Sequence, residues 1–155
     1  MKPVDQTAFH PGADVPEAEV GNCWSACIAS ILEVPIDDVP TFAAHDDWWE
    51  RTQAWLKERG YGIYPIPPQV IDAMGVHPAA LDCWYIAAGR SPRGEFDHAV
   101  VASGQRIGHD PNPERTGLVG PIRDLCVLFK LDADPDPAWE LAPQVELVGT
   151  VTVSA

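Results

Sequence analysis

Three side chains capable of amide-bond chemistry occur in this sequence in the order Cys23, His98 and Asp110. A cysteine attacks a carbonyl carbon as its thiolate, and a helix N-terminus or a nearby histidine favours that form. Cys23 follows Asn22, a good N-cap residue, so we expect it in the first turn of a helix, where its backbone amide can donate to an oxyanion. We expect His98 to act as the base and Asp110 to orient the imidazole ring.

Apolar periodicity predicts the helices that position the cysteine. The first helix begins at Cys23 and is ended by Pro35, and its apolar face comprises Trp24, Cys27, Ile28, Ile31 and Leu32. A second helix is expected from Asp46 or Asp47 to Gly60. We expect its tryptophans in the core rather than in a substrate-binding wall; these are Trp48, Trp49 and Trp55.

Apolar and β-branched runs predict strands after the helices, separated by turn-rich segments. A tight turn at 104–105 pairs the strand of His98 with residues 106–107, which brings Asp110 beside the imidazole. A helix followed by antiparallel strands indicates an α+β fold, with the N-terminal helix packed on a mostly antiparallel sheet of about five strands. The main strands are expected at 61–66, 83–88, 98–102 and 125–131, with a short helix at 69–74.

The length of 155 residues fits one domain. Residues 1–21 are rich in proline and glycine and predict an extended arm, and residues 1–131 form the predicted catalytic domain. Residues 132–155 are expected to comprise an acidic, proline-rich linker at 132–139 and a late strand at 145–153, packed on the same domain.

Composition restricts the partners and the compartment. The formal net charge of −13 repels phosphate backbones and anionic lipids, which argues against nucleic acid and membrane as partners. No signal-peptide core and no membrane-spanning apolar run is visible, so we expect a cytoplasmic protein. Four cysteines without a C-x-x-C pair predict free thiols, with Cys27, Cys83 and Cys126 in the core.

Three segments carry recognisable motifs in order: GNCWSACIASIL at 21–32, DHAVV at 97–101 and GHDPNP at 108–113. Together they resemble the papain-like cysteine peptidases. The similarity is closest to the compact bacterial and phage branch that is similar to the bacteriocin-processing (double-glycine) peptidases. The resemblance covers approximately residues 5–130 and implies a papain-like fold with a catalytic triad.

By position, the resemblance makes Cys23 the nucleophile, His98 the base and Asp110 the orienting acid. Papain relatives also carry an oxyanion-hole glutamine a few residues before the cysteine. The only upstream glutamine in this chain is Gln6, which lies further away and is therefore the candidate. The resemblance implies a peptidase or isopeptidase that forms a thioester acyl-enzyme on a peptide or protein substrate, with no cofactor and no metal.

Further side chains are candidates for binding the substrate. Trp24 adjoins the cysteine, and Arg93 and Arg115 flank the expected cleft, where an arginine can bind a carboxylate. His109 adjoins Asp110 and is an alternative histidine partner for the cysteine.

Three other interpretations stay open. The same triad serves other amidases and acyltransferases, since a fold does not determine the substrate. A non-catalytic binding protein that kept the scaffold predicts ordinary thiol reactivity at Cys23. A zinc site is the third, although the paired spacing usual for structural zinc is missing; its ligands would be Cys23, Cys27, His98 and His109.

Overall fold

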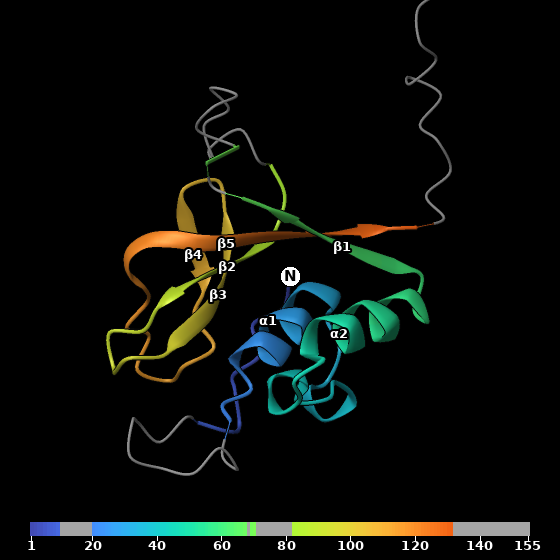
Figure 1. The fold of residues 1–155 in the computed structure, drawn as a ribbon, viewed down its shortest axis with the longest axis horizontal. Helices are drawn as coiled ribbons and strands as arrows, with labels where there is room; N and C mark the ends of the chain where they lie inside the picture. The colour runs from blue at the N-terminus through green and yellow to red at the C-terminus, as the bar shows by residue number, and fades with distance from the viewer. Residues whose placement is uncertain (10–19, 68, 71–81, 132–155) are drawn as a thin grey trace, which may run out of the picture.

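The computed structural model describes residues 1–9, 20–67, 69–70 and 82–131 (Figure 1). The linker and late strand predicted at 132–155 lie outside these residues, as does most of the helix predicted at 69–74. In chain order the elements are α1 (Cys23–Leu32), the 3-10 helices η1 (Ile36–Asp38) and η2 (Phe42–Ala44), α2 (Trp48–Lys57), β1 (Tyr61–Ile66), β2 (Tyr85–Arg90), β3 (Asp97–Ser103), β4 (Arg106–His109) and β5 (Val119–Lys130).

The strands of the described residues form one antiparallel sheet in the order β1-β5-β2-β3-β4. Both α-helices lie on the same side of this sheet, below it in Figure 1. Helix α1 packs chiefly on β3, and α2 packs on β1 and η2. The predicted α+β fold class, with the N-terminal helix packed on an antiparallel sheet, is therefore confirmed.

Helix α1 begins at Cys23 as predicted, but the side chain of Asn22 does not cap it. Asn22 Oδ1 instead accepts hydrogen bonds from the backbone N–H groups of Thr7 and Ala8, at 3.0 and 2.9 Å. Its Nδ2 donates to Thr7 Oγ1 at 3.0 Å. Asn22 therefore anchors the N-terminal arm, and no side chain of the described residues caps the first backbone amides of the helix.

Helix α2 follows Asp47 as predicted and buries Thr52 and Leu56. The prediction that its tryptophans belong to the core holds for Trp49 and Trp55, which are partly buried against the main cluster, but is wrong for Trp48. Trp48 is 39% exposed, and both Trp48 and Trp49 border a cavity. The apolar face of α2 extends beyond the core that covers it, so its first turn faces open space.

Strand β5 is longer than the predicted run at 125–131 and begins at Val119. Gly120 and Pro121 fall where the pairing of β5 with β2 is irregular. Gly120 has a φ of 77°, which glycine adopts freely, and such irregularities tolerate a proline that cannot donate to the ladder. Strand β2 begins later than predicted, so Cys83 precedes it and is exposed rather than in the core.

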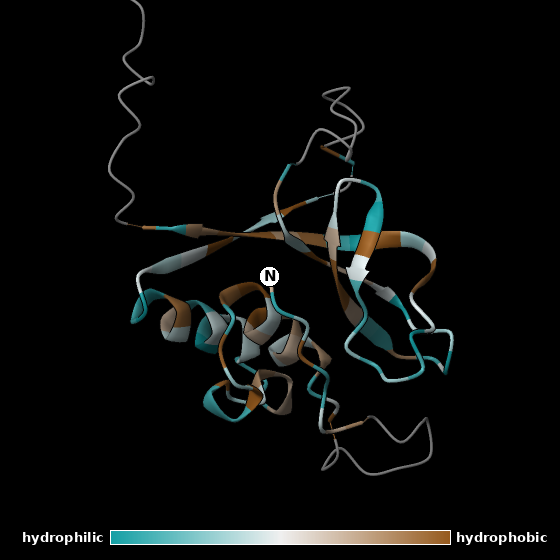
Figure 2. Ribbon diagram, turned by 180° about the vertical axis from the view of Figure 1, so that it is seen from behind, coloured by the Kyte–Doolittle hydropathy of each residue, from teal (hydrophilic) through white to brown (hydrophobic). Residues whose placement is uncertain are grey.

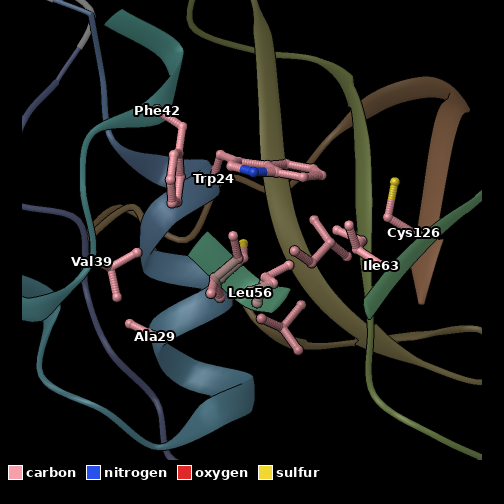
Figure 3. Packing of buried hydrophobic residues seen from close by; sticks show 12 residues of the cluster. Trp24, Ala29, Val39, Phe42, Leu56, Ile63 and Cys126 are labelled. Atoms are coloured by element: carbon pink, nitrogen blue, oxygen red, sulfur yellow. The ribbon is translucent and has the colours of Figure 1, made fainter. Parts of the chain in front are cut away.

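The main hydrophobic core lies between the sheet and the helices. Figure 3 shows part of it, in which Trp24 lies at one end of a cluster that includes Leu56, Ile63 and Cys126. A smaller cluster comprises Tyr85, Ala87, Val100, Ala102 and Leu125. In Figure 2 the part of β5 that crosses the sheet is coloured as hydrophobic.

Strand β3 contributes to both clusters, because successive side chains of a strand point to opposite faces. Ala99 and Val101 belong to the main core, and Val100 and Ala102 belong to the smaller cluster. His98, directly before this run, is therefore held on a strand that is buried on both faces.

The arm predicted at 1–21 has neither helix nor strand over residues 1–9 and 20–21, and residues 10–19 lie outside the described residues. The N–H of Lys2 donates to Ser30 O at 3.0 Å, and the N–H of Gln6 donates to Pro111 O at 2.9 Å. The arm therefore joins α1 to the loop after β4. Among the described residues, no helix has the length and apolar character needed to span a membrane.

Candidate active site

Cys23 lies half-buried at the start of α1 and borders two cavities of about 430 and 110 Å³. Four residues line both cavities: Cys23, Ala43, Asp97 and His98. Cys27, one turn further along the helix, is fully buried in the core. Of the two cysteines on this helix, the first is the one that a ligand can reach.

The β3–β4 hairpin brings His98 and Asp110 together, as the sequence predicted. Pairing of Val101 with His109 places the end of β4 beside β3, and Asp110 follows immediately. His98 Nε2 lies 2.8 Å from Asp110 Oδ1, and both side chains are buried. Cys23 lies close enough to the ring to contribute to raising the pKa of His98. Since Asp110 engages Nε2, Nδ1 is the nitrogen left for the cysteine.

The loop after β4 holds the Asp110 carboxylate with two further donors. Asp110 Oδ1 accepts the N–H of Asn112 at 2.8 Å, and Oδ2 accepts the N–H of Gly117 at 2.7 Å. Sequence reasoning missed both of these positioning residues. The Asp-Pro sequence at 110–111 was the available signal for the first, because an aspartate in such a turn binds the backbone N–H two residues on.

The titration of His98 is set by opposing effects. Burial lowers its pKa, but hydrogen bonds to Asp110 and Cys23 and their charges outweigh burial and raise the pKa to about 9. Burial raises the pKa of Asp110, whereas hydrogen bonds from His98 and from two backbone amides lower it below its ordinary value. At neutral pH the two side chains therefore form an imidazolium–carboxylate pair, and an imidazolium next to a cysteine stabilises a thiolate.

This ion pair predicts a pH-dependent contribution to stability. The pKa of folded His98, about 9, exceeds its ordinary value of 6.5, so the contribution is complete below pH 6.5 and is lost as pH rises through 9. The lowered pKa of Asp110 means that its contribution is lost only in acid, as pH falls through that pKa. Asp110 supplies part of the rise in the His98 pKa and Cys23 the rest, so we expect Asp110→Asn to lower the free energy of unfolding by up to about 3 kcal/mol more at pH 6 than at pH 10.

Urea denaturation of both proteins between pH 6 and pH 10 measures this difference. Asp37→Asn, which changes an exposed carboxylate, is the control and should give a loss that does not vary with pH in this way. An Asp110→Asn deficit of equal size at both pH values would contradict the ion pair.

The N-terminal arm brings Gln6 to the same place, despite its distance in the sequence. Gln6 is 5% exposed and lines the smaller cavity together with Cys23 and His98. Its Nε2 donates to Ala8 O at 2.9 Å, which leaves a second N–H on that nitrogen. The candidate oxyanion-hole glutamine therefore lies beside the cysteine, in a position to donate a hydrogen bond.

Tryptophans form one wall of the larger cavity. Trp24, a predicted substrate-binding residue, lines this cavity but is only 7% exposed, and its Nε1 donates to Thr52 Oγ1 at 3.3 Å. Its ring meets the edge of Trp48 at 5.4 Å between centroids and lies 6.2 Å from Trp49. Trp24 therefore packs against Trp48 and Trp49, which are both more exposed than Trp24 itself. Of the two, Trp48 is the exposed wall residue that the sequence had assigned to the core.

The two candidate arginines have different surroundings. Arg93, a predicted substrate-binding residue, lines the smaller cavity. Arg115 lines neither cavity and forms an ion pair with Asp5 at 2.7 Å. It also donates to the carbonyl oxygens of Asp110 and Asn112. Arg115 therefore ties the arm to the Asp110 loop, and the structure offers it no contact with a substrate.

His109, the alternative partner for the cysteine, points to the arm. Its Nε2 lies 2.9 Å from Val4 O and 3.4 Å from Asp5 Oδ1, and it lines neither cavity. In the part of the chain that the structure describes, no three His, Cys, Asp or Glu side chains converge as a metal site would require. The four residues considered for zinc are therefore not gathered around one point.

Comparison with known proteins adds no relative: no family model, no curated protein and no solved structure matches this chain.

Proposed function

We propose that this chain is a papain-like cysteine hydrolase that cleaves an amide bond in a peptide or protein. The observation that carries the proposal is that Cys23 and His98 lie together at the border of two cavities, with His98 paired to the buried Asp110. The arrangement of a cysteine at a helix N-terminus, a histidine on an antiparallel sheet and an acid after the next strand supports the papain-like assignment.

In the acylation step, Cys23 Sγ attacks the carbonyl carbon of the bound amide. Negative charge then develops on the carbonyl oxygen. Two N–H groups would donate hydrogen bonds to it: the backbone N–H of Cys23 and the second Nε2 hydrogen of Gln6. The His98 imidazolium donates its proton to the amide nitrogen, the C–N bond breaks, and the amine leaves. The acyl group remains as a thioester on Sγ.

In the deacylation step, His98, now neutral, removes a proton from water as the water oxygen attacks the thioester carbon. The C–S bond breaks, the carboxylic acid leaves, and the thiolate–imidazolium pair is restored. Asp110 stays ionised throughout and stabilises the imidazolium each time it forms.

The larger cavity indicates which substrates this reaction accepts. Its volume of about 430 Å³ lies within the range of roughly 300–1,000 Å³ typical of ligand pockets. Trp24, Trp48 and Trp49 make much of its lining apolar and aromatic. We therefore assign it to a bulky apolar side chain next to the scissile bond.

Incubation with a peptide library tests the proposal without a known substrate. Wild-type protein should produce new peptide termini, and Cys23→Ser should produce none, because serine at this position lacks a thiolate. Adding a primary amine to the reaction distinguishes hydrolysis from acyl transfer, since a transferase yields the new amide. Identical peptide profiles for the two proteins, with no acyl group detected on Cys23 by mass spectrometry, would contradict a hydrolase.

A further inference from the structure

Two residues that line the smaller cavity each carry a buried polar atom without a hydrogen-bond partner among the described residues. The two atoms are Gln6 Oε1 and Arg93 Nε. Gln6 is 95% buried, since its exposed fraction is 5%. Folded proteins pair nearly all of their buried polar atoms, so exceptions at a cavity call for a ligand or another function.

Arg93 also differs from neighbouring arginines, because it has no carboxylate partner among the described residues. Among the described residues it forms no ion pair, and its Cζ lies 5.6 Å from the centroid of the Phe96 ring. Three other arginines each have a carboxylate partner: Arg90 pairs with Glu95, Arg115 with Asp5 and Arg123 with Asp97. The guanidinium of Arg93 is thus a cation at the cavity without a described counter-ion.

Asp97, the acidic residue that lines the same cavity, does not cancel this charge. Its Oδ1 lies 2.8 Å from Arg123 Nη1, so its own charge is already compensated. The electrostatic preference of the smaller cavity is therefore for an anion at Arg93.

The two unpaired atoms specify complementary ligand chemistry. Gln6 Oε1 accepts a hydrogen bond, so it requires an N–H donor. Arg93 donates and is positively charged, and a carboxylate is the group that its guanidinium binds best. The cavity of about 110 Å³ falls below the range of roughly 300–1,000 Å³ for drug-sized ligands, so it admits a small group.

We propose that the substrate of Cys23 carries a carboxylate close to the scissile amide, bound by Arg93, with an N–H bound by Gln6. The bulky apolar group of the substrate occupies the larger cavity, so Cys23 lies between an apolar and an anionic subsite. The substrate class is an acylated amino acid or a peptide cut beside a small carboxylate-bearing residue. This inference rests on the proposed hydrolase function.

Alkylation of Cys23 by two small reagents tests the anionic subsite without any substrate. Iodoacetate and iodoacetamide have almost the same size, but only iodoacetate presents a carboxylate to Arg93. The second-order rate of each reagent at Cys23 is measured by peptide mass mapping, and their ratio within each variant corrects for general changes at the thiol. We expect Arg93→Gln to lower the iodoacetate-to-iodoacetamide ratio roughly tenfold, as for the loss of a charged hydrogen bond.

Arg90→Gln is the matched control, because Arg90 is exposed, is paired with Glu95 and does not line this cavity. It should keep the wild-type ratio. A reactive Cys23 whose ratio is the same in wild type and Arg93→Gln, or falls equally in both variants, overturns the carboxylate subsite alone. A Cys23 that is inert to both reagents overturns the proposed function as well.

Discussion

Cys23→Ala and His98→Ala are each expected to lower kcat by about 10⁴-fold or more, because nucleophile and base act as one unit. Without the thiol no thioester forms, and without the imidazole neither the leaving amine nor the attacking water exchanges its proton. Asp110→Ala is expected to cost less, about 10²–10⁴-fold, since Asp110 orients and stabilises the imidazolium but exchanges no proton. Steady-state kinetics on a peptide identified from the library would measure all three.

Two exposed residues of the same types provide the controls. Cys83→Ala and His45→Ala remove an exposed cysteine and an exposed histidine that line neither cavity, so both variants should retain activity. Thermal unfolding of each variant shows whether a loss of activity reflects unfolding. Full activity in folded His98→Ala would remove the histidine from the mechanism.

Cys23 is expected to react with iodoacetamide at pH 6 about 100-fold faster than the other cysteines, because only a thiolate is an effective nucleophile. Burial raises the pKa of Cys27 well above its ordinary value and that of Cys126 to about 12. Cys83 is exposed, but partial burial and then the charge of Asp82 raise its pKa, so it stays protonated at pH 6. Limiting reagent followed by peptide mass mapping gives the rate at each site.

Cys83 makes this experiment decisive, since it separates exposure from activation. If exposure alone determined reactivity, Cys83 would be labelled at least as fast as the half-buried Cys23. The pKa of His98, about 9, means that the imidazolium persists through neutral pH and is lost only as pH rises through 9. The selectivity for Cys23 should therefore hold from pH 6 to 8 and disappear in His98→Ala. Equal labelling of Cys23 and Cys83 in the wild type at pH 6 would favour the non-catalytic binding protein.

The elements that carry the triad could be predicted from the sequence because their signals are local. The apolar spacing after Cys23 predicted a helix beginning at that residue, and α1 begins there. The turn before Arg106 predicted that the next strand pairs back on the strand of His98, which placed Asp110 beside the ring, at 2.8 Å in the structure. Helix periodicity and hairpin turns depend on residues within a few positions of each other, so the chain specifies them segment by segment.

The local sequence pattern gave a wrong prediction at Asn22, whose side chain had two possible hydrogen-bond partners. Asn22 has the side chain of an N-cap, yet it binds the backbone of Thr7 and Ala8. A partner distant in the sequence therefore replaced the interaction that local preference predicted.

The sequence by itself determined the fold class, the position of Cys23 on its helix and the hairpin that joins His98 to Asp110. Only the tertiary structure decided what surrounds them: Gln6 returns to the cysteine, Arg93 borders the smaller cavity, and Trp48 borders the larger one. Cavities are made where elements distant in the sequence fail to fill the space between them, and the polar atoms left unpaired there depend on every neighbour at once. Periodicity and turn chemistry describe one segment at a time, so they specify the catalytic elements but not the cavities between them.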